Sequence, residues 1–141
     1  MGNYTTGPRV SKIDVLGITY DIKVCPRDED PYLNDNPGCG GYCDTDAKVI
    51  VLPDFTDDRY YKRQHLTPKA IDNRWKVGMR HELVHAFLAE SGLDDNALAW
   101  NHSWTNNEEM SDWIAIMGPR LIKAWQKCGC LDEEPATKRR K

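Results

Sequence analysis

Residues 67–91 read TPKAIDNRWKVGMRHELVHAFLAES, and the expected architecture depends on this segment because it has the features of one long helix. Thr67 is a good N-cap, and Pro68 suits the first helical position. Gly92 follows directly and is a typical stop signal at a helix C-terminus. Near its end, the predicted helix carries the pentapeptide HELVH at 81–85.

In HELVH, two histidines lie one helical turn apart. At about 100° per residue, His81 and His85 are separated by about 40° around the helix, so their imidazoles can converge on one metal ion. Glu82 lies beside them but points too far round to complete a tetrahedral site, and it is placed to take a proton from water. Because the pattern specifies only three positions, a chance match on an amphipathic helix is the alternative. Gly78, one turn upstream, would let another element approach this face closely.

A third ligand is expected from a second helix, in the segment NEEMSD at 107–112. Glu108 and Asp112 are four residues apart and share one helix face. Glu108 can complete a Zn²⁺ site of two histidines and one glutamate, and Asp112 can accept the free ring N–H of a ligand histidine. Two alternatives stay open. The acidic residues can be a solvated helix start favoured by the macrodipole, or Glu109 can be the ligand if the register shifts by one residue.

Alternating apolar residues before the long helix predict strands. Residues 11–25 (SKIDVLGITYDIKVC) predict two strands joined by a tight turn at Gly17, and residues 42–52 (YCDTDAKVIVL) predict a second pair. The stretch 26–41 is dense in Pro, Asp, Asn and Gly, so we expect a loop there.

The second helix is expected from Thr105 to about Lys127, with a kink at Gly118-Pro119. Small residues on its Glu108 face allow close helix packing, and an apolar face that includes Trp113 is expected to pack against the sheet or other core elements. Strands thus precede helices, which predicts an α+β fold. A small, mainly antiparallel N-terminal sheet would pack against the HELVH helix and the C-terminal helix with the glutamate ligand.

Length and charge limit the possible classes of protein. The 141 residues predict one compact domain with an ordered core over about 10–130 and a frayed basic tail at 132–141. Charged residues make up 29% and the net charge is −3, so a nucleic-acid partner is not expected. The N-terminus lacks the apolar core of a signal peptide, and no window approaches the roughly 18 apolar residues of a membrane span. We expect a cytoplasmic protein without a membrane partner.

The chain contains five cysteines, which are Cys25, Cys39, Cys43, Cys128 and Cys130. An odd number in a reducing compartment favours free thiols over a disulfide framework. A four-thiolate zinc site is the less favoured alternative, because the spacing is not that of a zinc ribbon or finger.

HELVH followed by NEEMSD resembles the gluzincin metallopeptidases, in which HExxH on one helix is joined by Glu in an E-x-x-x-D arrangement on a later helix. The thermolysin-like motif N-E-x-x-S-D is matched at 107–112, and the resemblance covers about residues 80–117. It implies a minimal zincin-like site. His81, His85 and Glu108 would be the zinc ligands and Glu82 the general base, with Asp112 supporting a ligand.

The longer run RHELVHAFLAESGL…NEEMSDWIAI also resembles small uncharacterised HExxH proteins encoded in bacteriophages and prophages. For a phage-encoded protein the expected compartment is the host cytoplasm. The large substrate-binding domain and the calcium sites of thermolysin-like enzymes have no counterpart here, so the resemblance carries no cleavage specificity.

These features predict a zinc-dependent hydrolase of peptide bonds, with a peptide or protein as substrate. A donor for the oxyanion is expected as well, and His102 in the loop between the helices is the candidate, with Tyr60 and Tyr61 as alternatives. Two other functions are compatible with the motif. One is a non-catalytic interaction protein in which zinc staples two helices, and the other is hydrolysis of a non-peptide amide.

Overall fold

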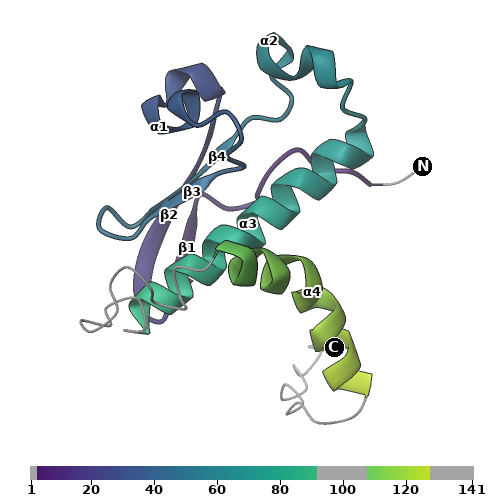
Figure 1. Ribbon diagram of the computed structural model, residues 1–141. Coiled ribbons are helices and arrows are strands. Elements are labelled where there is room, and N and C mark those ends of the chain that lie inside the picture. The colour runs from purple at the N-terminus through teal and green to yellow at the C-terminus, as the bar shows by residue number, and fades with distance from the viewer. Residues whose placement is uncertain (1–2, 92–107, 128–141) are drawn as a thin grey trace, which may run out of the picture.

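The structure is a computed structural model, and it describes residues 3–91 and 108–127. Some predicted features lie outside these residues: Gly92, His102, Thr105, Cys128, Cys130 and the basic tail 132–141. Within the described ranges the fold is α+β, as predicted, with a four-stranded sheet and helices (Figure 1). None of the described helices has the length and apolar character needed to cross a membrane.

The sheet is built from two hairpins. Its strands are β1 (Lys12–Val15), β2 (Ile18–Cys25), β3 (Tyr42–Asp44) and β4 (Val49–Pro53), arranged in the order β1-β2-β4-β3. The hairpins β1–β2 and β3–β4 are antiparallel, as predicted, whereas the central pair β2–β4 is parallel. The sheet is therefore mixed, and its one parallel pairing is not signalled by any local turn.

The turn between β1 and β2 explains why the first hairpin can be predicted from the sequence. Leu16 and Gly17 both have positive φ, 51° and 90°. Two consecutive positive φ angles are the geometry of a type I′ turn, whose twist matches that of the strands it joins. Gly17 adopts such an angle without steric conflict, which favours the turn at this position.

The segment 26–41, predicted as a loop, contains two short helices, η1 (Arg27–Glu29) and α1 (Pro31–Asp35). The loop prediction is wrong for α1 because the segment carries its own helix start. The Asp30 side chain accepts a hydrogen bond from the Leu33 backbone N–H at 3.0 Å, and proline occupies the first helical position. Farther along, α2 (Asp58–Tyr61) and η2 (Lys62–Gln64) lead to the long helix.

The buried side chain of Arg27 holds the 26–41 connection in place. Only 3% of this residue is exposed. Its guanidinium donates hydrogen bonds to the carbonyl oxygens of Leu33, Asn36 and Cys39 and to the Tyr61 hydroxyl. These bonds position the glycine-rich loop that follows α1.

The long helix α3 (Pro68–Glu90) forms where the sequence predicts it, and the Thr67 hydroxyl accepts a hydrogen bond from the Ala70 backbone N–H. Figure 1 shows α3 crossing the sheet. The core forms between them from Val15, Tyr20, Ile22, Ile50, Leu52, Met79 and Ala86. The core lies on one side of α3 and fixes the HELVH segment against the sheet. The other faces of the helix therefore remain free to contact α4 or a ligand.

The last described helix, α4 (Glu108–Lys127), packs on α3 (Figure 1). Ser111 and Ala115 are fully buried in this contact, as their small size predicts. The Ala115 carbonyl oxygen also accepts a hydrogen bond from Nε of Arg80 at 2.6 Å. The helix continues through Pro119, and its ribbon bends along its length, in line with the predicted kink.

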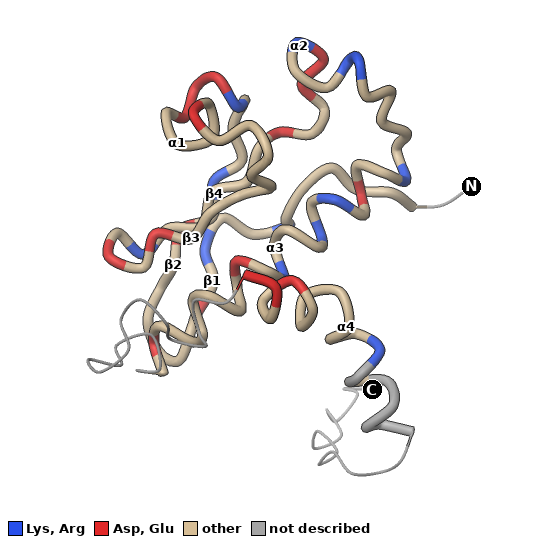
Figure 2. The backbone as a smooth tube through the Cα atoms, in the orientation of Figure 1, with Lys and Arg blue, Asp and Glu red and all other residues tan. Residues whose placement is uncertain are grey.

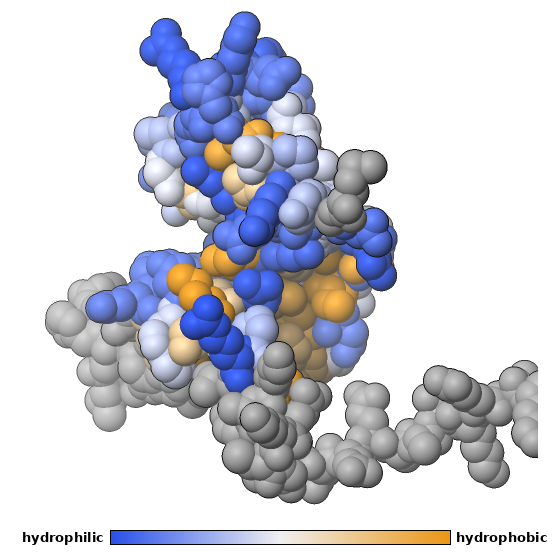
Figure 3. Space-filling model, turned by 90° about the vertical axis from the view of Figure 1, so that its right-hand side faces the viewer, coloured by the Kyte–Doolittle hydropathy of each residue, from blue (hydrophilic) through white to orange (hydrophobic). Residues whose placement is uncertain are grey.

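The apolar side of α4, expected to pack against the sheet or other core elements, is only partly covered. Trp113 is 54% exposed, because α4 packs on α3 rather than on the sheet. Ile116 of α4 and Phe87 of α3 are also exposed. Figure 3 shows hydrophobic patches among hydrophilic atoms on one face of the molecule.

Candidate metal centre

The two histidines of HELVH project from α3 toward one point. Nε2 of His81 lies 3.0 Å from Nε2 of His85, and both side chains are largely buried. This arrangement follows from the helix, which places residues four apart on one face. The helix α3 alone therefore brings two ring nitrogens together.

Glu108 approaches the histidine pair from the first turn of α4. Its Oε2 lies 2.9 Å from Nε2 of His81, and its Oε1 lies 3.1 Å from Nε2 of His85. One donor atom from each of the three residues lies within 4.8 Å of the others. Glu109 is exposed and does not belong to this group. The fold therefore brings Glu108, and not Glu109, to the histidines.

Asp112 contacts the other nitrogen of the first histidine. Its Oδ1 lies 2.6 Å from Nδ1 of His81. With the ring proton on Nδ1 donated to this carboxylate, Nε2 presents its lone pair toward His85 and Glu108. Asp112 thus occupies the supporting position that the spacing predicts.

The donor set fits a zinc ion in chemistry and in spacing. Two imidazole nitrogens and one carboxylate oxygen are ligands that zinc accepts, and three protein ligands leave a fourth position open. A tetrahedral ion with donor distances of about 2.0–2.2 Å requires donors about 3.3–3.6 Å apart. Nε2 of His81 lies 3.0 Å from Nε2 of His85, while the two histidines contact different oxygens of Glu108, and one donor atom from each residue lies within 4.8 Å of the others. Small side-chain movements would bring the three donors to the spacing that the ion requires.

Glu82 lies beside this group and is 6% exposed. Its Oε1 is 3.8 Å from Nε2 of His81, and it is not one of the three converging ligands. Burial raises the pKa of Glu82 to about 7, because the ionised carboxylate loses its water. A positive charge on His81 opposes the rise, and the carboxylates of Glu108 and Asp112 add to it. A carboxyl group that titrates near neutral pH can both accept and return a proton.

The glycine loop after α1 covers Glu82. A Cβ atom on Gly41, whose φ is 142°, would lie 2.7 Å from Cδ2 of Leu52 and 3.6 Å from Cγ of Glu82. On the facing helix, a Cβ atom on Gly78 would lie 3.0 Å from the Gly40 carbonyl oxygen. The close approach expected at Gly78 is therefore made by this loop. The lack of side chains on both surfaces allows the loop to bury the Glu82 side chain.

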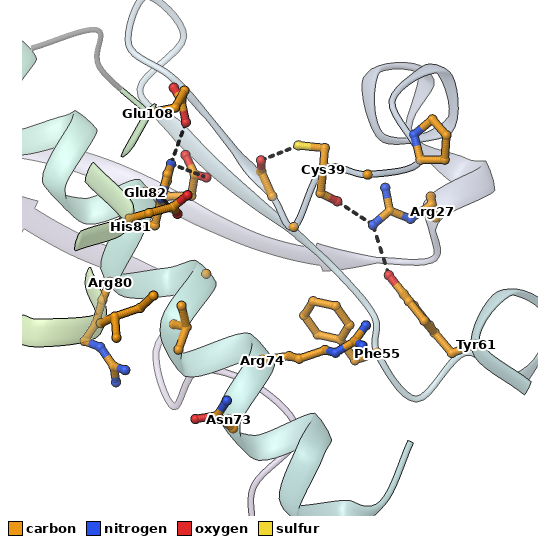
Figure 4. Close-up of a pocket in the computed structure, with 18 of the residues that line it drawn as sticks. Arg27, Cys39, Phe55, Tyr61, Asn73, Arg74, Arg80, His81, Glu82 and Glu108 are labelled. Atoms are coloured by element: carbon orange, nitrogen blue, oxygen red, sulfur yellow. Dashed lines mark hydrogen bonds and ion pairs between the residues drawn. The ribbon is translucent and has the colours of Figure 1, made fainter. Parts of the chain in front are cut away.

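A pocket of about 740 Å³ extends from the metal centre along α3. Figure 4 shows His81, Glu82 and Glu108 at one end and Arg27 and Tyr61 at the other. The carboxylate with the raised pKa therefore faces a space large enough for part of a substrate.

The remaining candidate residues differ in position. Tyr60 and Tyr61 line the pocket, but the Tyr60 hydroxyl donates to the Pro37 carbonyl oxygen and the Tyr61 hydroxyl accepts from Arg27, both at 3.0 Å. The oxyanion candidate His102 lies outside the described residues. His65 is exposed.

Three of the five cysteines are described, and none of Cys25, Cys39 and Cys43 belongs to a disulfide, as predicted. Cys39 lines the pocket and donates a hydrogen bond from its Sγ to the Gly41 carbonyl oxygen at 2.6 Å. Burial raises the pKa of the Cys39 thiol, which favours its protonated form.

The sequence alone did not identify the arginines of the pocket, which are Arg27, Arg74, Arg80 and Arg120. Helical spacing was a usable signal for one of them. Arg74 precedes His81 by seven residues, or two turns, and therefore shares its face of α3. Arg27 and Arg120 are brought to the pocket by tertiary folding, so no local pattern could have found them.

Comparison with known proteins gave no match: no protein-family model, no curated protein and no solved structure matches the chain. The function proposed below therefore rests on the side chains of this centre and their geometry.

Proposed function

We propose that this chain is a zinc-dependent peptide-bond hydrolase, a small metallopeptidase of the gluzincin type. The observation that carries the proposal is the convergence of His81, His85 and Glu108 beside a buried Glu82 at one end of a pocket. His81, His85 and Glu108 would hold the ion. A zinc ion held there supplies Lewis-acid activation of water and of the substrate carbonyl.

Glu82 acts as the general base and then as the general acid. It accepts a proton from the attacking water as the water oxygen bonds to the carbonyl carbon, and it returns this proton to the leaving amine as the C–N bond breaks. In the metal-free chain, burial raises the pKa of Glu82 to about 7, so the site stabilises the protonated form that delivers the proton to the leaving amine. The reaction needs no covalent intermediate between enzyme and substrate.

Asp112 is a positioning residue in this proposal. By accepting the Nδ1 proton of His81 it holds the ring plane and keeps the Nε2 lone pair directed at the shared ligand point. The buried contact of Ser111 and Ala115 with α3 keeps Glu108 and Asp112 in register with the histidines.

The sheet offers a way to bind an extended substrate. Among the described strands, β3 pairs only with β4, so its other side is an open edge. β3 starts directly after Gly41, which lies against Glu82. A peptide that adds to this edge as a further strand would pass beside the general base.

A zinc-stapled interaction protein without catalytic activity is the alternative, since the three converging side chains come from two helices. The burial of Glu82 beside the three ligands, without being a ligand itself, favours hydrolysis over this alternative. A purely structural site gains nothing from a carboxyl group that is buried beside it without being a ligand.

The test compares the zinc-loaded wild type with Glu82→Gln. A peptide library is incubated with each protein, new termini are identified by mass spectrometry, and zinc is measured by elemental analysis. We expect Glu82→Gln to retain one zinc per chain and to lose cleavage by about 100-fold or more. Glu109→Gln, the same change at an exposed neighbour, should retain both properties.

Two results would contradict the proposal. If zinc binds and neither protein cleaves any peptide, the peptidase proposal is wrong, and the stapled protein and the hydrolase of a non-peptide amide remain. If Glu82→Gln cleaves as fast as the wild type, Glu82 is not the general base.

A further inference from the structure

The pocket carries a concentration of positive charge that the hydrolytic centre does not use. Four arginines of the described residues line it, although the chain as a whole has a net charge of −3. Figure 4 shows Arg27 and Arg74 on the side of the pocket away from His81 and Glu108. Figure 2 shows acidic residues gathered where α4 begins, beside α3. The two ends of the pocket therefore differ in charge.

The arginines at the basic end have only neutral partners. Arg27 is buried, and its guanidinium donates to backbone carbonyls and one tyrosine hydroxyl, while its Nε has no acceptor among the described residues. Arg74 is exposed, and its Nη1 donates to the Gln64 side-chain oxygen at 2.8 Å. Neither forms an ion pair with a carboxylate in the described ranges, so no carboxylate there neutralises their charge, and the exposed Arg74 can meet a ligand.

The other two arginines are likewise without carboxylate partners in the part of the chain that is described. Arg80 donates from Nε to the Ala115 carbonyl oxygen, and Arg120 lies exposed on α4. The carboxylates of Glu108 and Asp112, by contrast, face His81. The acidic groups of the pocket are thus engaged at the metal centre, whereas its basic groups are not.

The position of Arg74 relates it to the bond that would be cleaved. It precedes His81 by two helical turns, which is about 10 Å along α3. An extended peptide advances about 3.3 Å per residue, so this distance corresponds to about three residues. The Arg74 guanidinium is thereby placed to meet one particular side chain of a peptide whose scissile bond lies at Glu82.

We infer that the pocket selects polypeptide substrates with an aspartate or glutamate about three residues from the cleaved bond, on the side toward the start of α3, and that Arg74 binds this carboxylate. The inference rests on the proposed peptidase function and adds its substrate class. Arginine suits the role because its planar guanidinium can donate two parallel hydrogen bonds to a carboxylate. The buried charge of Arg27 strengthens the positive potential at the same end.

A nucleic acid fits this pocket less well. Its phosphates carry negative charge at every step along the chain, so it would meet Glu82, Glu108 and Asp112 at the far end of the same cleft. A peptide places its negative charge at a single position and leaves the metal centre to a neutral amide.

The first experiment measures cleavage preference in a peptide library with zinc-loaded wild type, Arg74→Gln and Arg74→Glu. We expect the wild type to favour glutamate over glutamine at one position by about 5- to 10-fold in kcat/KM. Arg74→Gln should abolish this preference, and Arg74→Glu should reverse it toward lysine at the same position. Lys69→Glu is the matched control, because it makes the same charge change at an exposed site on α3 outside the pocket lining.

The second experiment measures binding without turnover. Fluorescein-labelled peptides that differ only in glutamate, glutamine or lysine at the selected position are titrated into zinc-loaded Glu82→Gln, with and without Arg74→Glu. If the library shows no cleavage, no position has been selected, and the glutamate, glutamine or lysine is then placed at each position of the peptide in turn. The acidic peptide should bind about 5- to 10-fold more tightly, and the added Arg74→Glu should invert this order.

The outcomes separate the two proposals. Cleavage with no acidic preference, or with a preference unchanged in Arg74→Glu, overturns the inference and leaves the peptidase proposal standing. Absence of all cleavage refutes the peptidase, and the binding order of the three peptides then decides only whether Arg74 selects an acidic side chain. An Arg74-dependent affinity for a single-stranded oligonucleotide that exceeds the affinity for the acidic peptide would overturn the inference in favour of nucleic acid.

Discussion

Replacing Glu82 by Gln in the metal-free protein should make the chain more stable at alkaline pH. Glu82 is almost fully buried, and its pKa is raised from 4.5 to about 7. The folded state therefore binds a proton at Glu82 more tightly than the unfolded state does. Stability falls as pH rises from about 4.5 to 7, and the full cost of holding the ionised carboxylate is present above pH 7.

The size of the effect follows from the pKa. Raising it from 4.5 to about 7 corresponds to about 3 kcal/mol, at about 1.4 kcal/mol per pH unit. The glutamine amide of the variant has a burial cost of its own, but that cost does not depend on pH. The quantity to measure is therefore the change in the stability difference between pH 4.5 and pH 8.5, which should be about 3 kcal/mol in favour of Glu82→Gln.

Urea unfolding of both proteins in EDTA at the two pH values provides the measurement. Glu109→Gln is the control, since the same substitution at an exposed carboxylate should give about the same difference at both pH values. A stability difference between the wild type and Glu82→Gln that does not change with pH would refute the reasoning, because Glu82 would then not be held in a site that disfavours its charge.

Four further predictions concern the metal centre and the N-terminal segment. Glu108→Ala should weaken zinc binding, measured by isothermal titration calorimetry as one site per chain, far more than Glu109→Ala; the reverse order would mean that the wrong glutamate is assigned. Asp112→Asn should retain zinc and lose about 10- to 100-fold in zinc affinity or turnover; unchanged values would reduce it to a surface carboxylate. Chelation should lower the melting temperature while leaving the chain largely folded, and bound zinc should decrease toward about pH 5 because the histidines must be neutral to bind; identical melting curves with and without chelator at pH 7 and 5 would exclude the site. The pKa of Asp72 is lowered to about 2, chiefly by a hydrogen bond from the Thr5 backbone N–H, so its stabilisation is present above about pH 4 and lost toward pH 2. The urea midpoint of the wild type should accordingly exceed that of Asp72→Asn at pH 6 and approach it at pH 2.5, and an equal difference at both pH values would contradict this assignment.

The features that were readable from the sequence are those encoded within a few neighbouring residues. The start of α3 follows from the Thr67 cap and the proline after it, which act within one helical turn. The β1–β2 hairpin follows from a glycine at the turn between two alternating runs. The convergence of His81 and His85 needs only the helix itself, because its period places residues four apart on one face.

Contacts between distant segments decided the rest. The parallel β2–β4 pairing joins strands that no short turn connects. Trp113 stays exposed because α4 packs on α3 rather than on the sheet, and amphipathic spacing does not state which partner a helix chooses. The choice of Glu108 over Glu109 depends on how α4 is rotated against α3, and this rotation is set by the buried contact of Ser111 and Ala115.

The chemistry of the site divides in the same way. HELVH supplies a carboxyl group next to a histidine pair in any helix that contains it. The loop at Gly40 and Gly41, some forty residues earlier in the chain, is what buries Glu82 and raises its pKa to about 7. Residue type and helical period are local properties, whereas desolvation depends on which distant segments exclude water from a side chain, and only the folded chain brings those segments together.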